Sequence, residues 1–299
     1  MPVLVPKGFL ILSKDGHKHS GVYRGMLELL ARFGYASTDE VMYGFDLTWQ
    51  TALNRFVYLE ELGLVKKFAS DTRPPWFYCL TAGGREAVRG FDISEDVCVF
   101  VPSYYVWSMQ KHQRTMMKVF LALKKLLGAH FQGWVSERTL KSEAESDARL
   151  MGRDKRVWDG ECLLNVELQE HTEGLNGVLI PTGKTKTEQW RCAVELELSL
   201  KSPERYRRQF STLAKQVYDS WDKKQTVPVM LFLYSTPAVY DRLMKYLNEP
   251  GKDYGNCIFF FAQEDQFLKD LGTASMTRVL RGEHLILPAS QMNIVRYSL

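Results

Sequence analysis

The chain has 299 residues, of which 45% are hydrophobic and 25% are charged. This balance suits a globular protein of about two domains, and no apolar run approaches the roughly 18 residues that a membrane span needs. The net charge of +4 only mildly favours a polyanionic partner. The five cysteines stand singly, without a CxxC pair, which is typical of reduced thiols rather than of a disulfide framework or a zinc ribbon. We therefore expect a cytoplasmic protein with no membrane partner.

Residues 21–91 carry the clearest pattern of short helices. GMLELLARFGY repeats apolar residues at helical spacing. STDEVMYGF offers Ser37 or Thr38 as a helix N-cap, and Glu40 is placed to complete a capping box. Thr48 can cap a third helix within TWQTALNRFVYLEELGLV. The sequence therefore predicts three short helices in succession.

Two short strands and a final helix are expected next. VKKFASDTRPPWFYCLT predicts two strands around a polar tip that contains proline, and TAGGREAVRGF begins a helix with Thr81 as its cap. This layout and the phrase LEELGLVKKF…WFYCLTAGGREAV resemble the winged helix-turn-helix family. The resemblance implies that residues 1–95 form a domain that binds double-stranded DNA. In such domains the third helix enters the major groove and the hairpin, or wing, contacts the backbone or the minor groove.

The resemblance implies DNA contacts from the third helix and from the wing. Exposed helix residues whose types suit base edges and phosphates are Thr48, Gln50, Thr51, Asn54 and Arg55. The candidates on the wing are Lys66, Lys67 and Arg73. Acidic residues close the helix, which weakens the positive field expected of a non-specific DNA binder. A winged-helix module used only for protein contacts is the alternative.

A segment without helical rhythm, residues 96–110, is predicted to link this domain to a second one over residues 111–299. HQRTMMKVFLALKKLLGAHF predicts an amphipathic helix, and the probable strands that follow are ECLLNVEL, GVLIPT, CAVELELSL and, after another helix, VPVMLFLYST. A further helix leads to CIFFFAQ. Buried strands and helices in this order indicate an α/β domain with a mixed sheet. PTGKTKT lacks the upstream glycine of a phosphate-binding loop, and its place between two strands predicts a hairpin turn.

The stretch VELELSLK, residues 194–201, places polar groups on one face of a strand, because side chains alternate with period two. The polar groups belong to Glu195, Glu197, Ser199 and Lys201. Two interpretations of this face remain open: a metal site, or the solvated side of a half-buried strand. Apolar neighbouring strands favour a central position, where charges are costly unless they line a cleft. Basic residues near the start of the next helix, which include Arg205 and Arg208, favour a groove that holds phosphates.

The order of elements over residues 111–299 resembles the restriction-endonuclease-like superfamily of metal-dependent nucleases. In that family an acidic residue begins one strand in a PDG-like phrase, and the next strand carries an acidic residue, one spacer and then lysine. The matching phrases here are LNGVLIP and VELELSLK. An upstream winged helix joined to such a domain is similar to the replication-relaxation group, which includes the MobC-type plasmid mobilization relaxases. TnsA-type transposon endonucleases have the same two parts in the opposite order and fit less well.

This resemblance implies an endonuclease or nickase that uses Mg²⁺ or Mn²⁺, since these hard cations favour carboxylate oxygens. Glu195 and Glu197 would be the metal ligands, and Lys201 would steady the phosphate. Asn176 stands where the family has aspartate, and it supplies an oxygen without a charge. Asp159, in RVWDGE, is the alternative ligand.

Two functions therefore remain open. The first is a relaxase-like nickase that recognises and cuts a specific plasmid or mobile-element site. The second is a catalytically inactive, nuclease-like DNA-binding regulator or an accessory factor of replication or mobilization. Double-stranded DNA is the expected partner in both, and other mobilization or replication proteins are further candidates. A homodimer would be natural for a winged helix that reads a palindrome.

Overall fold

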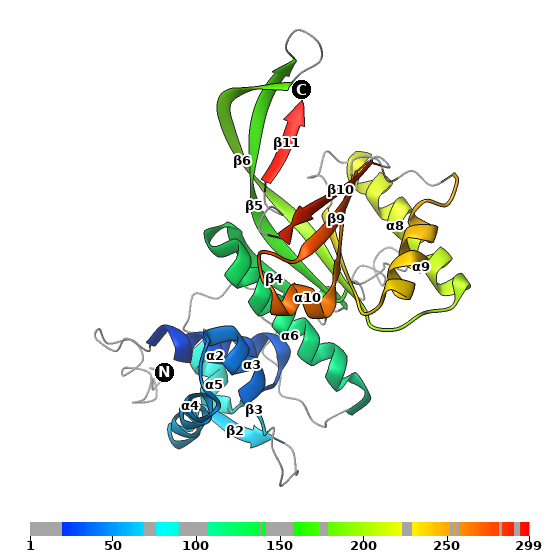
Figure 1. Cartoon of the computed structure of the whole chain (residues 1–299). Coiled ribbons are helices and arrows are strands. Elements are labelled where there is room, and N and C mark those ends of the chain that lie inside the picture. The colour runs from blue at the N-terminus through cyan, green and yellow to red at the C-terminus, as the bar shows by residue number, and fades with distance from the viewer. Residues whose placement is uncertain are drawn as a thin grey trace. The chain divides into compact units, whose positions relative to one another are not determined.

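The structure is a computed structural model that describes residues 20–68, 76–89, 107–137, 139–141, 158–173, 179–222, 229–251, 254, 257–280, 283–289 and 294–298. The described helices and strands make a mixed α/β protein, as predicted (Figure 1). The chain divides into two compact units, Met1–Leu121 and Ala122–Leu299. Within the described ranges, no helix combines the length and the apolar character that crossing a bilayer requires.

The first unit contains the short helices and the hairpin that the sequence predicted. Its elements, in chain order, are α2 (Ser20–Phe33), β1 (Ala36–Ser37), α3 (Thr38–Phe45), α4 (Trp49–Glu61), β2 (Val65–Phe68), β3 (Phe77–Leu80) and α5 (Ala82–Arg89). The three strands form a small antiparallel sheet in the order β1–β3–β2. The sequence patterns over residues 21–91 thus correctly predicted the kind and order of these helices and of the hairpin.

Side-chain caps set the starts of α3 and α4. The Ser37 hydroxyl accepts a hydrogen bond from the Asp39 N–H at 3.2 Å, and the Glu40 carboxylate accepts one from the Ser37 N–H at 2.9 Å. Thr48 caps α4 by accepting from the Thr51 N–H at 3.3 Å. These contacts satisfy N–H groups that the first helical turn leaves without a helical partner. The predicted capping box is therefore confirmed, with Ser37 as the cap.

The start of helix α6 (Trp107–Leu127) belongs to the first unit. Arg114 reaches α3, with Nε 2.6 Å from Glu40 Oε1 and Nη2 2.7 Å from Asp39 Oδ2. The Tyr35 hydroxyl donates to Gln113 Oε1 at 2.7 Å. Glu40 is fully buried, and a buried charge must be paired with good geometry. Because these contacts hold α6 to α3, the division between the units falls inside α6, after the predicted linker at 96–110.

The described strands of the second unit form one mixed sheet of eight strands, against which helices pack. Its elements are η1 (Gly128–His130), β4 (Phe131–Ser136), β5 (Gly160–Glu173), β6 (Leu179–Glu197), α8 (Pro203–Asp222), β7 (Val229–Tyr234), α9 (Pro237–Leu247), β8 (Ile258–Gln263), α10 (Glu264–Lys269), β9 (Ser275–Leu280), β10 (Glu283–Pro288) and β11 (Ile294–Ser298). The strand order is β10–β9–β8–β7–β6–β5–β11, and β4 pairs with β5.

Parallel and antiparallel pairs are mixed across this sheet, and β9 and β10 continue it from β8 as antiparallel strands. Strands β6, β7 and β8 are parallel, with α8 and α9 as their crossovers. Strands β4, β5 and β6 form an antiparallel meander. Figure 1 shows the β5–β6 hairpin extending beyond the other strands, with β11 alongside it. Strand β6 therefore lies between β5 and β7, in the central position that the sequence predicted.

Strand β6 is longer than the sequence predicted. The segment 181–187, PTGKTKT, lies inside the strand, so the predicted hairpin turn there is wrong. His171 pairs with Pro181 and Gln169 pairs with Thr185, with an irregular register between them. Gly183 has a φ of 77°, a left-handed conformation that glycine adopts without steric cost. A bulge therefore absorbs the extra residues, and the strand continues on both sides of it.

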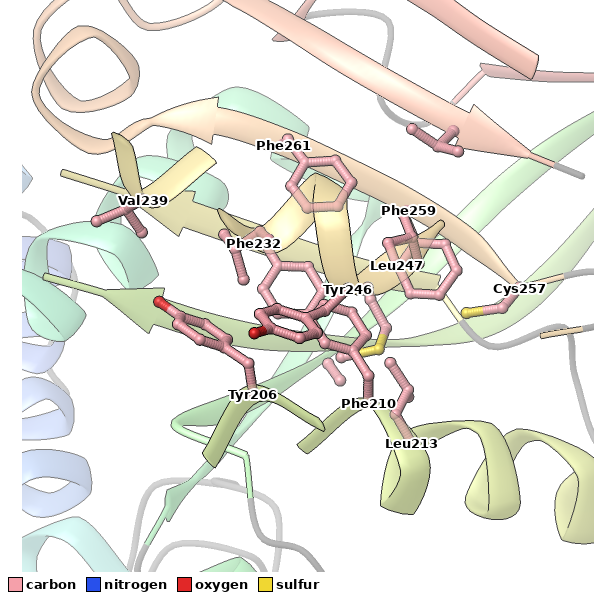
Figure 2. Close-up of a cluster of buried hydrophobic side chains, with 14 residues drawn as sticks. Tyr206, Phe210, Leu213, Phe232, Val239, Tyr246, Leu247, Cys257, Phe259 and Phe261 are labelled. Atoms are coloured by element: carbon pink, nitrogen blue, oxygen red, sulfur yellow. The ribbon is translucent and has the colours of Figure 1, made fainter. Parts of the chain in front are cut away.

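Helices α8 and α9 cover one face of the parallel strands through a largely aromatic cluster (Figure 2). Phe232 of β7 stacks on Phe261 of β8 with ring centroids 5.3 Å apart, and on Phe210 of α8 at 5.8 Å. Tyr206 of α8 stacks on Tyr246 of α9 at 5.6 Å. Burial of each such ring contributes about 1.5–3 kcal/mol. This cluster holds the first turns of α8 against the end of β6.

A tandem glycine pair in α5 provides a test of the packing in the first unit. A Cβ atom at Gly84 would lie 1.9 Å from the Leu64 carbonyl oxygen, whereas one at Gly83 would lie 3.4 Å from the Gly63 oxygen. We expect Gly84→Ala to lower the free energy of unfolding by about 2 kcal/mol, because backbone must move. Gly83→Ala is the matched control and should raise it by up to about 1 kcal/mol through helix propensity. Urea unfolding of both variants measures this difference, and equal effects would contradict the close approach of α5 to Leu64.

Candidate functional site

Two glutamates at the carboxyl end of β6 face helix α8. Glu195 and Glu197 lie on the same strand face as Ala193, which belongs to the aromatic cluster beneath α8 and α9. Glu197 is fully buried, and Glu195 is 5% exposed. The interpretation of this face as the solvated side of a strand is therefore wrong. Burial of charge is costly unless partners compensate it.

Two side chains compensate part of this buried charge. The Gln209 amide on α8 donates to Glu195 Oε1 at 3.3 Å and to Glu197 Oε1 at 3.1 Å. Lys201 Nζ forms an ion pair with the same oxygen of Glu197. The other oxygen of Glu197, Oε2, is buried and makes no hydrogen bond within the described part of the chain. The pair thus brings two acidic groups together with one ammonium and one amide.

Asp159 lies beside the glutamates. Gly160 pairs with Val194 across the β5–β6 hairpin, so the residue just before β5 stands next to the end of β6. Asp159 Oδ2 accepts a hydrogen bond from the Leu196 N–H at 2.8 Å. Leu196 separates the two glutamates in sequence, so Asp159 contacts the backbone between them.

Asn176 falls between β5 and β6 in the sequence. The residue itself lies outside the described residues, but its flanks are described. Glu173 and Leu179 pair at the end of the hairpin opposite to Asp159. The register of the described strands therefore places Asp159 beside the end of β6.

The negative charge at the end of β6 acts on a neighbouring tyrosine. The pKa of Tyr206 is raised above its ordinary value, first by burial and then by the charge of Glu197. Tyr206 is fully buried within the cluster, and Figure 2 shows its ring beside that of Tyr246. Burial and a nearby negative charge both disfavour the phenolate. Tyr206 therefore keeps its hydroxyl proton and lines the site as a neutral side chain.

Sequence reasoning missed Gln209 and Tyr206 as members of this group. Both lie on the buried face of α8 together with Phe210 and Leu213. A glutamine on the apolar face of an amphipathic helix indicates a buried partner, since buried polar groups are hydrogen-bonded. That signal was present in the sequence, but only the structure shows which groups the amide contacts.

The basic residues predicted on α8 are solvent-exposed. Arg205 lies one helical turn before Gln209 and so projects from the same side of α8, while Arg208 points further outward. Arg207 is also exposed and lies 3.4 Å from Glu249, with its guanidinium 5.6 Å from the centre of the Tyr246 ring. The first turns of α8 thus carry exposed positive charge next to a buried negative site.

The predicted contact residues of α4 separate into exposed and buried ones. Thr48, Gln50 and Asn54 are exposed, and Thr51 is half-buried. Arg55 is buried, with its guanidinium 5.2 Å from the centre of the Tyr23 ring. The expectation that Arg55 is exposed is therefore wrong, because its helical position points toward α2.

Two of the three wing candidates lie on β2. Lys66 and Lys67 are exposed, and Lys67 Nζ lies 4.0 Å from the centre of the Trp76 ring. Trp76 also contacts Trp49 at the start of α4, with ring centroids 6.4 Å apart. Arg73 lies outside the described residues. A cation–π contact therefore links Lys67 to Trp76, the residue just before β3.

Comparison with protein-family models, with curated proteins and with solved structures finds no significant match for this chain. Its sites are therefore judged by their own residues. In the ranges that the structure describes, no three His, Cys, Asp or Glu side chains converge as a ready-made metal-binding group. Glu195 and Glu197 offer two carboxylates, a number with which Mg²⁺ is commonly bound when water and phosphate complete its shell.

The buried pair generates a prediction about stability. We expect Glu195→Gln to raise the free energy of unfolding by about 1 kcal/mol in EDTA, because it removes repulsion between like charges and keeps the shape. Asp241→Asn, at an exposed position of α9, is the matched control and should change it by less than about 0.5 kcal/mol. Urea unfolding measures both. Destabilisation by Glu195→Gln would mean that the present partners already compensate both charges fully.

Proposed function

We propose that this protein binds a specific double-stranded DNA site and nicks it in a reaction that depends on Mg²⁺ or Mn²⁺. The observation that carries the proposal is the buried pair Glu195 and Glu197 at the carboxyl end of a central strand, with Asp159 beside it. Apolar side chains at positions 195 and 197 would serve the fold equally well, so the fold itself does not need two buried carboxylates there. Such groups are typical of sites that bind cations or do chemistry.

The first unit supports DNA binding by its order of elements. Helix, strand, helix, helix, strand, strand is the order of a winged helix-turn-helix, and here it runs from α2 to β3. The third helix of that order is α4, whose exposed side chains are mainly neutral and polar at its amino-terminal half. Lys66 and Lys67 on β2 supply exposed positive charge for the DNA backbone.

The second unit supports a nuclease-like fold by its connectivity. Three antiparallel strands, a helix and a parallel strand follow one another as β4, β5, β6, α8 and β7. This is the order of the restriction-endonuclease-like core. Asp159, in the phrase VWDG, stands immediately before β5, and Glu195-Leu196-Glu197 ends β6. These are the positions at which that superfamily carries its acidic residues.

The chain's own residues fit a divalent cation and a phosphate. Glu197 Oε2 is a buried carboxylate oxygen with no hydrogen bond in the described part of the chain, and a cation would satisfy it. Mg²⁺ or Mn²⁺, when bound, would polarise the phosphate and activate water. Lys201 forms an ion pair with Glu197, and Gln209 orients both carboxylates through hydrogen bonds. Arg205 adds an exposed positive charge on the same side of α8.

A second candidate function is a DNA-binding regulator or accessory factor that does not cut. Lys201 and Gln209 already compensate the two glutamates, and Asp159 is engaged by a backbone N–H. The absence of a ready-made group of three metal ligands among the described residues also favours this alternative. It keeps the DNA-binding function of the first unit and assigns the second unit a binding role.

Cleavage of supercoiled plasmid separates the two candidates. The wild type should convert supercoiled DNA to open circles only when Mg²⁺ or Mn²⁺ is present. Glu195→Gln should lower the rate more than about 100-fold, since loss of even an outer partner of a metal costs 10–100-fold. Its affinity for DNA should stay unchanged, and Asp241→Asn should cut like the wild type. Specific DNA binding with no metal-dependent nicking would select the regulator.

Salt dependence tests whether the wing contacts DNA. We expect Lys66→Gln and Lys67→Gln each to weaken DNA binding and to reduce the slope of log K against log salt by about 1, because each removes one phosphate contact. Lys245→Gln changes an exposed lysine of α9 and serves as the control. Fluorescence anisotropy at several salt concentrations gives the slopes. Unchanged slopes in both wing variants would exclude these lysines from the interface.

A further inference from the structure

A stripe on the exposed face of α4 carries two amides and one aliphatic side chain. Gln50, Asn54 and Val57 recur at i, i+4 and i+7, a spacing that aligns side chains along one helix face. Gln50 and Asn54 are exposed, and Val57 is 41% exposed. The apolar neighbours of Val57, Phe56 and Leu59, are fully buried. Val57 is therefore an apolar group on the surface of a helix whose other side holds the core.

This stripe carries no cationic group. Helix α4, WQTALNRFVYLEE, contains a single basic residue, Arg55. That side chain is buried, with its guanidinium over the Tyr23 ring. Guanine presents two acceptors, O6 and N7, in the major groove, and arginine or lysine is the usual reader of that edge. The inward position of Arg55 thus removes the one group on α4 that suits guanine.

The two amides are already oriented by each other. Gln50 Nε2 donates to Asn54 Oδ1 at 2.8 Å. This bond leaves the Gln50 carbonyl oxygen as an acceptor and the Asn54 amide as a donor. Adenine needs the same combination in the major groove, because its N7 accepts and its N6 amino group donates. Guanine would instead place its O6 acceptor against the Gln50 carbonyl oxygen, which is repulsive.

Val57 lies one turn beyond this pair and offers methyl groups at the same face. In the major groove the C5-methyl group of thymine is the apolar feature that such a side chain contacts. Glu60 and Glu61, both exposed, follow at the carboxyl end of α4. Their charge disfavours close approach of that end to phosphates. The part of α4 that precedes Glu60 is therefore the part suited to enter the groove.

We propose that α4 reads adenine–thymine pairs in the major groove, with Gln50 and Asn54 as the readers of adenine and Val57 as the reader of the thymine methyl group. This inference rests on the proposed DNA binding of the first unit and defines the kind of sequence that it recognises. The specificity arises from neutral side chains, and the lysines of β2 supply affinity without sequence preference.

Selection from a random DNA pool with the full chain tests the proposal, followed by modified bases in the selected site. Adenine and thymine should be enriched at the contacted positions. Uracil in place of thymine removes the methyl group and should weaken wild-type binding roughly tenfold, since a good base contact contributes about 1–3 kcal/mol. Val57→Ala should bind both DNAs equally. Replacement of adenine by 7-deazaadenine should likewise weaken the wild type and leave Asn54→Ala unaffected.

Ile286→Ala removes an aliphatic side chain that is 74% exposed on β10, and it should respond to uracil as the wild type does. Enrichment of guanine at the contacted positions would overturn the inference while leaving DNA binding intact. Equal wild-type affinity for natural and modified sites would do the same. Absence of any salt-dependent DNA binding would overturn the proposed function together with this inference.

Discussion

The second unit depends on how two negative charges are held beneath a helix. Glu195 lies next to Phe232 on the adjacent strand, in the midst of an aromatic cluster. Gln209 on α8 donates hydrogen bonds to both glutamates, and Lys201 forms an ion pair with Glu197. The loop from β6 to α8 and the rotation of α8 are therefore constrained by polar contacts as well as by packing. Polar networks of this kind specify one arrangement only when their members are satisfied.

The first unit handles charge in a different way. Glu40 is buried but receives hydrogen bonds from Ser37 and from Arg114, so its charge is compensated by the capping box and by α6. Arg55 is turned inward over Tyr23. The amino-terminal part of α4 consequently exposes neutral side chains, while Glu60 and Glu61 are exposed at its carboxyl end and positive charge is left to β2. In the DNA-binding role that we propose, recognition and affinity would thereby fall to different elements of one small unit.

Local signals predicted much of this protein. Ser37 with Glu40, and Thr48 at the next helix, act over three residues, so the sequence alone located those helix starts. The alternation at 194–197 correctly placed both glutamates on one face. Contacts between residues that are distant in the sequence could not be predicted. The register of β5 on β6 decides that Asp159 lies beside Leu196, and the bulge at Gly183 decides that 181–187 stays in the strand. Both depend on pairing between distant residues, which periodicity does not encode.

The fold itself does not require carboxylates at 195 and 197. Apolar side chains of similar volume at these two positions would pack against Phe232 and the first turns of α8, and replacements of this kind are often neutral or stabilising. The chain instead carries two acids, an amide at Gln209 and an ammonium at Lys201, each of which loses hydration on folding. Positions at which a protein departs from the packing rule tend to be functional. The end of β6 is such a position, and the acid at Asp159 extends it toward β5.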